Sequence, residues 1–269
     1  MFKKYIALPQ DHGAWVFLLS PLLIGLFASR TFNPAAFVLC AAALMAFLLR
    51  QPLNIAIKVL SKRRQREDLP AALFWSGVYS GWLFVFVLWL VILGHARLLW
   101  LGVPAALVFA WHLWLVSRKS ERHQVGLEIV ATGVLALGAP AALWVSRETY
   151  DPQGWILWLL TWLQAAASIV YAYLRLEQRS WSAAPSTLRE HLRPAWRALL
   201  YATFNVAFAL VLGGLGIIPP LVWLAFALQW LEVIYGTLRP AIQFRPTAIG
   251  VRQLIVSTVF TILFIIFWR

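Results

Sequence analysis

Long runs of apolar residues, separated by short polar segments, make up most of the chain. A bilayer core of about 30 Å is crossed by roughly 20 apolar residues in helical conformation. In lipid, only helices and closed barrels satisfy all their backbone groups, and continuous runs of this length exclude a barrel. We therefore expect an all-α, polytopic membrane protein with a single domain, residues 1–269. Nine transmembrane helices are predicted, at about residues 14–30, 35–50, 71–94, 98–117, 125–146, 154–174, 195–217, 220–238 and 249–268.

The composition agrees with this pattern. Hydrophobic residues make up 62% of the chain and charged residues 12%, whereas soluble domains carry about 45–50% and about 25%. The net charge of +13 would indicate nucleic-acid binding in a soluble protein. Here the expected partners are membrane lipids, and no nucleic acid. The single cysteine, Cys40, cannot form an internal disulfide, and there is no CxxC motif, so no metal or cofactor is expected.

The basic residues predict the orientation. In the nine-helix topology, 19 of the 23 Lys and Arg residues lie on the side of the N-terminus. Positive charge marks the cytoplasmic side, so the N-terminus is expected inside and the C-terminus outside a bacterial cytoplasmic membrane. Two cytoplasmic loops stand out, at about residues 51–70 and 175–194. In the second, Thr187 and Glu190 have the spacing of a capping box, which predicts a short helix before Pro194.

Polar residues inside the predicted spans are the candidates for chemistry, because such residues are costly in lipid. Two helices carry a polar stripe at helical spacing: Gln164, Ser168, Tyr171 and Arg175 on one, and Gln229, Glu232, Gly236 and Arg239 on the other. His112 and Glu128 share the same inner half of the membrane. Alternatively, Glu128 and Glu232 pair with interfacial arginines, and His112 forms a hydrogen bond between helices.

The end of the second span carries a further polar face. Arg50, Asn54, Lys58 and Lys62 recur every four residues, so their side chains share one side of a helix. Snorkelling explains the charged residues one by one, but it does not explain Asn54. An amide between two cations offers a donor and an acceptor to whatever lies in front of that face.

The segment Asp11-His12-Gly13-Ala14-Trp15, with Ser20–Gly25 after it, resembles the start of the YwiC-like family of bacterial membrane proteins. The resemblance extends through Arg50–Leu53 and Glu128 to Arg175, and it implies no particular activity. It adds Asp11 and His12 to the candidate site. The alternative for these two residues is an N-cap aspartate beside an interfacial histidine.

More remotely, the architecture resembles the UbiA superfamily of intramembrane prenyltransferases. The resemblance implies a nine-helix ring and two Asp-rich motifs that hold diphosphate through Mg²⁺. At the comparable positions this chain has Asn54, Lys58 and Lys62, and then Tyr171, Arg175 and Arg179. Mg²⁺ prefers carboxylate oxygens, so Mg²⁺-dependent prenyl transfer is not expected. Whether any reaction is catalysed stays open.

Lysine and arginine at these places fit a phosphate without metal. We expect a basic, cytoplasm-facing cavity that binds an anionic amphiphile, an isoprenoid phosphate or a lipid headgroup. The candidate ligand-binding residues are Asp11, His12, Arg50, Asn54, Lys58, His112, Glu128, Arg175 and Glu232.

Two alternatives stay open. One is a proton-coupled transporter that uses His112, Glu128 and Glu232, and the other is a noncatalytic accessory protein of a membrane complex. Transporters often place their sites on interrupted helices. Here the small residues and the proline of the span 125–146 are expected to allow close packing rather than to break the helix. These residues are Gly126, Gly133, Ala136, Gly138 and Pro140.

Overall fold

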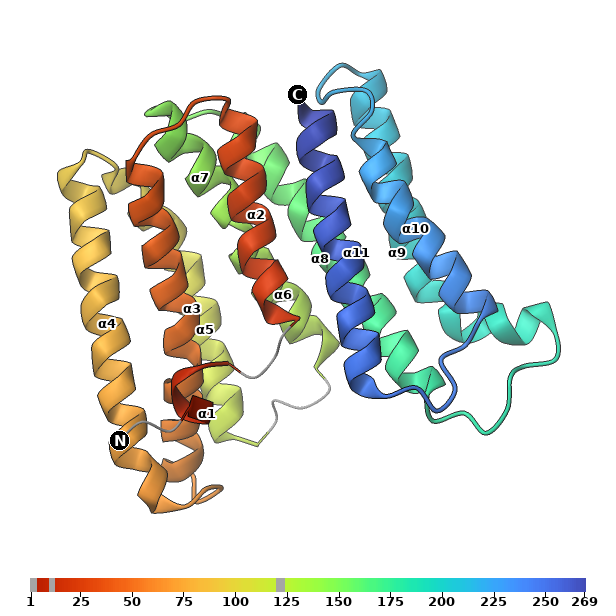
Figure 1. Ribbon diagram of the computed structural model, residues 1–269, viewed down its shortest axis with the longest axis horizontal. Helices are drawn as coiled ribbons and strands as arrows, with labels where there is room; N and C mark the ends of the chain where they lie inside the picture. The colour runs from red at the N-terminus through yellow and green to blue at the C-terminus, as the bar shows by residue number, and fades with distance from the viewer. Residues whose placement is uncertain (1–3, 10–12, 120–123) are drawn as a thin grey trace.

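The computed structural model describes residues 4–9, 13–119 and 124–269, and every regular element in these ranges is helical (Figure 1). This confirms the all-α prediction. The α-helices are α1 (Lys4–Ala7), α2 (Ala14–Ser29), α3 (Ala35–Leu60), α4 (Leu69–Ile92), α5 (Leu99–Ser117), α6 (Val125–Ala136), α7 (Gly138–Arg147), α8 (Gln153–Gln178), α9 (Leu188–Gly214), α10 (Trp223–Leu238) and α11 (Pro246–Trp268). Two 3₁₀ turns, η1 (Arg66–Asp68) and η2 (Ala96–Leu98), precede α4 and α5.

Seven helical segments in the described part of the chain are long and apolar enough to cross a membrane. They are α3, η1 with α4, η2 with α5, α6 with α7, α8, α9 and α11. Helices α2 and α10, of 16 residues each, complete the nine predicted spans. The number that cross the membrane and the orientation of the chain stay predictions.

The helices stand side by side in an elongated bundle, with α1 at its lower end and the C-terminus at its upper end (Figure 1). Helix α2 contacts α7, α11, α6 and α8. Helix α8 also contacts α9, α10 and α11. On the other side of the bundle, α3 and α4 pack closely together. The rings of Phe226, Phe260 and Phe264, packed edge to face and at a tilt, fill the core between α10 and α11. Helices α2, α7 and α8 therefore form the middle of the bundle.

Helices α2 and α7 approach each other most closely at Gly25. A Cβ atom built on Gly25 would lie 2.2 Å from the carbonyl oxygen of Ala139 and 2.9 Å from Cβ of Ala142. Small residues let helix backbones meet in a membrane, where packing rather than hydrophobic burial drives association. This contact holds α2 against α7.

The prediction of a loop at residues 51–70 is wrong for the first half of this range, because α3 continues to Leu60. The connection from α3 to α4 is therefore short. The extension has an apolar face as well as its polar one. Ile55, Ala56 and Val59 are buried against Ala71 and Ala72 of α4. Packing against α4 thus extends the helix beyond the apolar run.

The predicted loop 175–194 is also shorter in the structure. Helix α8 ends at Gln178 and α9 begins at Leu188. The capping box of Thr187 and Glu190 is confirmed. Pro194 does not end the helix, because it removes only the backbone bond to the exposed first turn, where water can replace it.

The small residues of the span 125–146 pack closely, as expected, at Gly133 against Trp162 and at Gly138 against Leu22. The expectation that the helix is unbroken is wrong at one residue, Leu137, which separates α6 from α7 within this span. The Leu137 amide donates to the Val134 carbonyl instead of continuing the regular ladder to Gly133. The carbonyl of Gly133 accepts instead from Nε1 of Trp158, at 2.8 Å. Pro140 has no N–H, so the Ala136 carbonyl also lacks its regular partner. Side-chain donors and proline together interrupt the helix inside the bundle.

Candidate functional site

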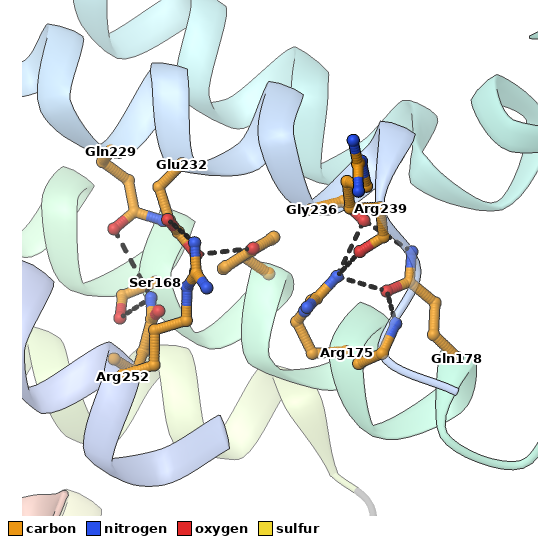
Figure 2. Close-up of polar contacts among 11 residues, drawn as sticks. Ser168, Arg175, Gln178, Gln229, Glu232, Gly236, Arg239 and Arg252 are labelled. Carbon is orange, nitrogen blue, oxygen red and sulfur yellow. Dashed lines mark hydrogen bonds and ion pairs between the residues drawn. The ribbon is translucent and has the colours of Figure 1, made fainter. Parts of the chain in front are cut away.

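The two polar stripes predicted from the sequence face each other across the contact between α8 and α10 (Figure 2). They meet at three levels, through Gln164 and Gln229, Tyr171 and Glu232, and Arg175 with the end of α10. Each level pairs polar groups of α8 with polar groups of α10, which are costly when they face lipid. The stripes therefore form an interior polar seam, which we call the α8–α10 seam.

Arg175 closes the end of this seam at the C-terminus of α10, on the right in Figure 2. Its side chain is buried, with the residue 3% exposed. Its Nη1 atom donates to the carbonyls of Gly236 and Arg239, at 2.8 and 2.7 Å, and to Oε1 of Gln178 at 2.9 Å. Carbonyls at a helix C-terminus carry partial negative charge, which a guanidinium stabilises. The contacts of Arg175 thus stabilise the end of α10.

Glu232 forms an ion pair with Arg252 of α11. The guanidinium donates from two nitrogens to the two carboxylate oxygens, at 2.6 and 2.8 Å. The hydroxyl of Tyr171 donates to the same carboxylate at 2.8 Å. Arg252 also lies over the ring of Tyr235, 4.5 Å from its centroid. In the structure, Glu232 therefore pairs with an arginine, which is the alternative given for it in the sequence analysis.

Replacing Glu232 with glutamine should lower the free energy of unfolding of the purified protein by about 2 kcal/mol, because it leaves the Arg252 charge without its counterion. The double variant Glu232→Gln with Arg252→Gln should lose less than the sum of the two single variants. Thermal unfolding of all four proteins in detergent measures this coupling. Strictly additive losses would contradict an ion pair that contributes to stability.

Carboxamides fill the middle of the bundle. Nε2 of Gln253 donates to Oγ of Ser168 at 2.8 Å and to Oε1 of Gln229 at 3.4 Å. The same oxygen of Gln229 accepts from Nε2 of Gln164 at 3.4 Å. Oε1 of Gln164 and Nε2 of Gln229 are buried and have no hydrogen-bond partner in the described part of the chain. The middle of the bundle therefore contains one hydrogen-bond acceptor and one donor that have no partner among the described residues.

Glu128 lies on the exposed side of α6. Its carboxylate accepts a hydrogen bond from the hydroxyl of Tyr173, at 2.8 Å, which joins α6 to α8. The glutamates predicted for one cavity thus have separate tyrosine partners on the same helix, Tyr173 and Tyr171.

Arg50, Asn54 and Lys58 share a half-buried face of α3, as their spacing predicts. Arg50 lies 5.4 Å from the ring centroid of Phe47. Oδ1 of Asn54 is buried without a hydrogen-bond partner among the described residues. His112 is half-buried on α5, which packs against α3. Asp11 and His12 lie outside the described residues.

A large groove runs between α5, α6, α7 and α8, with a volume of about 650 Å³. Its wall includes an aromatic ladder in which Trp144, Trp155, Trp158 and Trp162 follow one another at centroid distances of 5.4, 6.0 and 5.1 Å. The indole nitrogens of Trp158 and Trp162 donate to the carbonyls of Gly133 and Ile129, which fixes both rings. The lining is mostly apolar; Arg97, near the upper end, and Tyr150, whose hydroxyl accepts from Nε1 of Trp155, are its polar residues besides the tryptophans.

The polar residues of α5 and α8 continue the faces that line this groove. On α5, His112 follows the groove residue Val108 by four positions, one helical turn. On α8, Tyr173 follows Trp162 by eleven positions, about three turns, and so shares its face. His112 and the Tyr173–Glu128 pair thus lie beyond the lower end of the groove, opposite the end with Arg97.

The nine candidate residues do not form one cluster in the described structure. Arg50, Asn54 and Lys58 share α3, which packs against the helix of His112, whereas Arg175 and Glu232 belong to the α8–α10 seam. Arg252, Gln253 and Tyr173 were missed by sequence reasoning. Arg252 and Gln253 are adjacent polar residues inside a predicted span, and this signal could have found both. The described residues contain no group of three His, Cys, Asp or Glu able to hold a metal ion.

Long apolar helices, with many large hydrophobic side chains exposed on the outside and a polar seam within an apolar core, define an integral, polytopic helical membrane protein. Residues 8–143 match the family model described as YwiC-like protein. The chain belongs to the YwiC-like family, which confirms the resemblance at its N-terminal half. No curated protein and no solved structure matches the chain. The relation to the UbiA superfamily stays a prediction.

Proposed function

We propose that this protein, in the cytoplasmic membrane of a bacterium, binds an anionic amphiphile such as an isoprenoid phosphate or an anionic lipid. The headgroup binds at the predicted cytoplasmic end, beside Arg50, Asn54 and Lys58 of α3 and His112 of α5. The hydrocarbon chain lies along the aromatic groove. Mg²⁺-dependent prenyl transfer forms no part of the proposal.

The groove is the observation that carries this proposal. Its volume of about 650 Å³ falls within the range of about 300–1,000 Å³ found for ligand pockets. Along α5 it reaches from Trp100 to within one turn of His112. From Trp100 to His112 the helix advances by twelve residues, about 18 Å. This is a large part of a bilayer core of about 30 Å. A hydrocarbon chain whose headgroup lies at the level of His112 fits this length.

Two of the nine candidates have other roles in this proposal. Arg175 and Glu232 are engaged by carbonyls and by Arg252, so we assign them to the stability of the bundle. Asn54 keeps its place beside the headgroup, because its buried oxygen can accept a hydrogen bond from a lipid or phosphate hydroxyl.

Titration of the purified protein with farnesyl diphosphate, without added Mg²⁺, tests the headgroup site. Lys58→Glu should weaken binding by about tenfold or more, because the reversed charge repels the diphosphate. Arg189→Glu reverses an exposed charge on α9 and should change binding less than about twofold. Equal effects of the two reversals, or binding that requires Mg²⁺, would contradict the proposal.

Val108→Trp tests the groove in the same assay. The larger side chain occupies the lower part of the groove, so affinity for farnesyl diphosphate should fall while affinity for inorganic diphosphate does not. Thermal unfolding of each variant shows whether it is folded. Unchanged affinity in a folded Val108→Trp protein would remove the groove from the site.

Transport is a second candidate function, and the break between α6 and α7 favours it. Many transporters bind their substrates where a helix is interrupted near the middle of the membrane. Uptake into proteoliposomes under an imposed pH gradient tests the proton-coupled form.

A further inference from the structure

A small cavity lies in the middle of the bundle, between α2, α6, α8 and α11. Its volume of about 20 Å³ admits one particle the size of a water molecule. Thr161, in its wall, lies eight residues into α8, about 12 Å along the helix. The polar residues of the wall are Ser20, Thr132, Thr161, Gln164, Ser168 and Ser257.

The hydroxyl hydrogens of three of these residues are already used. Thr132 donates to the carbonyl of Ile129 at 2.9 Å, and Thr161 donates to that of Leu157 at 2.8 Å. The hydroxyl of Thr261 donates to the Ser257 carbonyl at 2.8 Å. Since a hydroxyl has one hydrogen, Ser20 must be the donor in its 2.6 Å bond with Thr261. These three oxygens of the wall can only accept.

Gln164 adds a stronger acceptor. The residue is 5% exposed, and its Nε2 atom donates to Gln229. Its Oε1 atom is buried and receives no hydrogen bond from the residues that the structure describes. Leaving a buried amide oxygen without a hydrogen bond or another partner is costly.

Two prolines leave main-chain carbonyls of wall residues without their regular donors. Pro21 lies inside α2 and Pro140 inside α7. Because proline has no N–H, the carbonyls four residues earlier, at Phe17 and Ala136, lose their regular donors. Both Phe17 and Ala136 line the cavity. Ala136 is also the last residue of α6, whose C-terminus carries partial negative charge.

Ser168 accepts from Gln253, so its hydroxyl and that of Ser257 remain as donors among the described residues of the wall. They are fewer than the acceptors, and one water molecule could satisfy only two of these. Divalent cations in proteins favour carboxylates, and the described residues of the wall include none. The nearby charge of Arg252 is balanced by Glu232. We propose that the cavity binds a dehydrated monovalent cation, Na⁺, through hydroxyl, amide and carbonyl oxygens of α2, α6 and α8. This site is independent of the amphiphile site.

Thermal unfolding of the purified, full-length protein tests the site in NaCl, KCl and choline chloride at equal ionic strength. Na⁺ should raise the unfolding temperature in a saturable way, because a ligand that binds only the folded state stabilises it. Choline should have no such effect, and K⁺ a smaller one. Binding of radioactive ²²Na⁺ gives a second, direct measurement.

Thr161→Val removes one oxygen and keeps the shape of the side chain. It should raise the half-saturating Na⁺ concentration by about tenfold. Thr258→Val is the matched control, because Thr258 makes the same bond to the carbonyl four residues earlier, at 2.8 Å, but is exposed on α11.

Thr132→Val offers a second test should Thr161→Val fail to fold. Equal effects of all three salts would mean that the cavity holds water only and would overturn the proposal. Unchanged Na⁺ affinity in folded Thr161→Val or Thr132→Val would do the same.

Discussion

Gly25→Ala is expected to destabilise the protein by about 3 kcal/mol or more, beyond the usual cost of one added methyl group. The new Cβ would lie 2.2 Å from the carbonyl oxygen of Ala139, which belongs to the backbone of α7 and cannot rotate away. Helices α2 and α7 would have to separate, and both helices contact α3 and α8. Thermal unfolding in detergent and the yield of monodisperse protein measure this loss.

Gly102→Ala is the matched control for this variant. Gly102 also lies inside a helix, α5, but a Cβ there would meet no atom within 4 Å. Alanine favours a helix over glycine by up to about 1 kcal/mol, so this variant should be as stable as the parent or slightly more so. Equal stability of the two variants would contradict the close contact between α2 and α7.

Arg175→Met should lower the free energy of unfolding by about 3 kcal/mol, which is the second large effect that we expect. The variant keeps an apolar stem but leaves the carbonyls of Gly236 and Arg239 without the charged donor that now lies 2.8 and 2.7 Å away. Buried acceptors that lose a charged partner carry a large desolvation cost. Arg175→Lys should recover part of the loss, since it keeps the charge but not the fork of donors.

Arg193→Met, at an exposed position of α9, should change stability by less than about 0.5 kcal/mol. The same variants separate two roles for Arg175. A stable Arg175→Met protein that no longer binds farnesyl diphosphate would contradict the structural role and return Arg175 to the ligand site. A destabilised protein that still binds the probe supports its role at the end of α10.

Much of the polar interior could be predicted from helical spacing alone. Gln164, Tyr171 and Arg175 lie on one side of a helix because the helical period places them there, as it does Gln229, Glu232 and Gly236. Lipid does not hydrogen-bond to such groups, so two polar stripes in neighbouring spans are expected to meet. The structure brings them together level by level.

Other features could not be predicted, because they depend on partners distant in sequence. Glu128 and Glu232 are similar residues at similar depth, and only the packing of α8 gives them different tyrosines. The sequence does not indicate that tryptophans line a groove, since Trp158 and Trp162 are held in place by hydrogen bonds to carbonyls of α6. The break at Leu137 depends partly on the Trp158 donor, which lies 25 residues away from its acceptor, Gly133.

The sequence by itself determined that this chain is an all-α membrane protein of the YwiC-like family. Both conclusions depend on local signals, the length and apolarity of successive runs and the motif around Trp15. Only the tertiary structure decided which polar groups satisfy one another and which are left over. The reason is physical: in lipid, the cost of a polar side chain depends on the partner that packing supplies. Residues such as Gln164 and Asn54, whose oxygens lack such a partner, are therefore recognised only in the folded bundle.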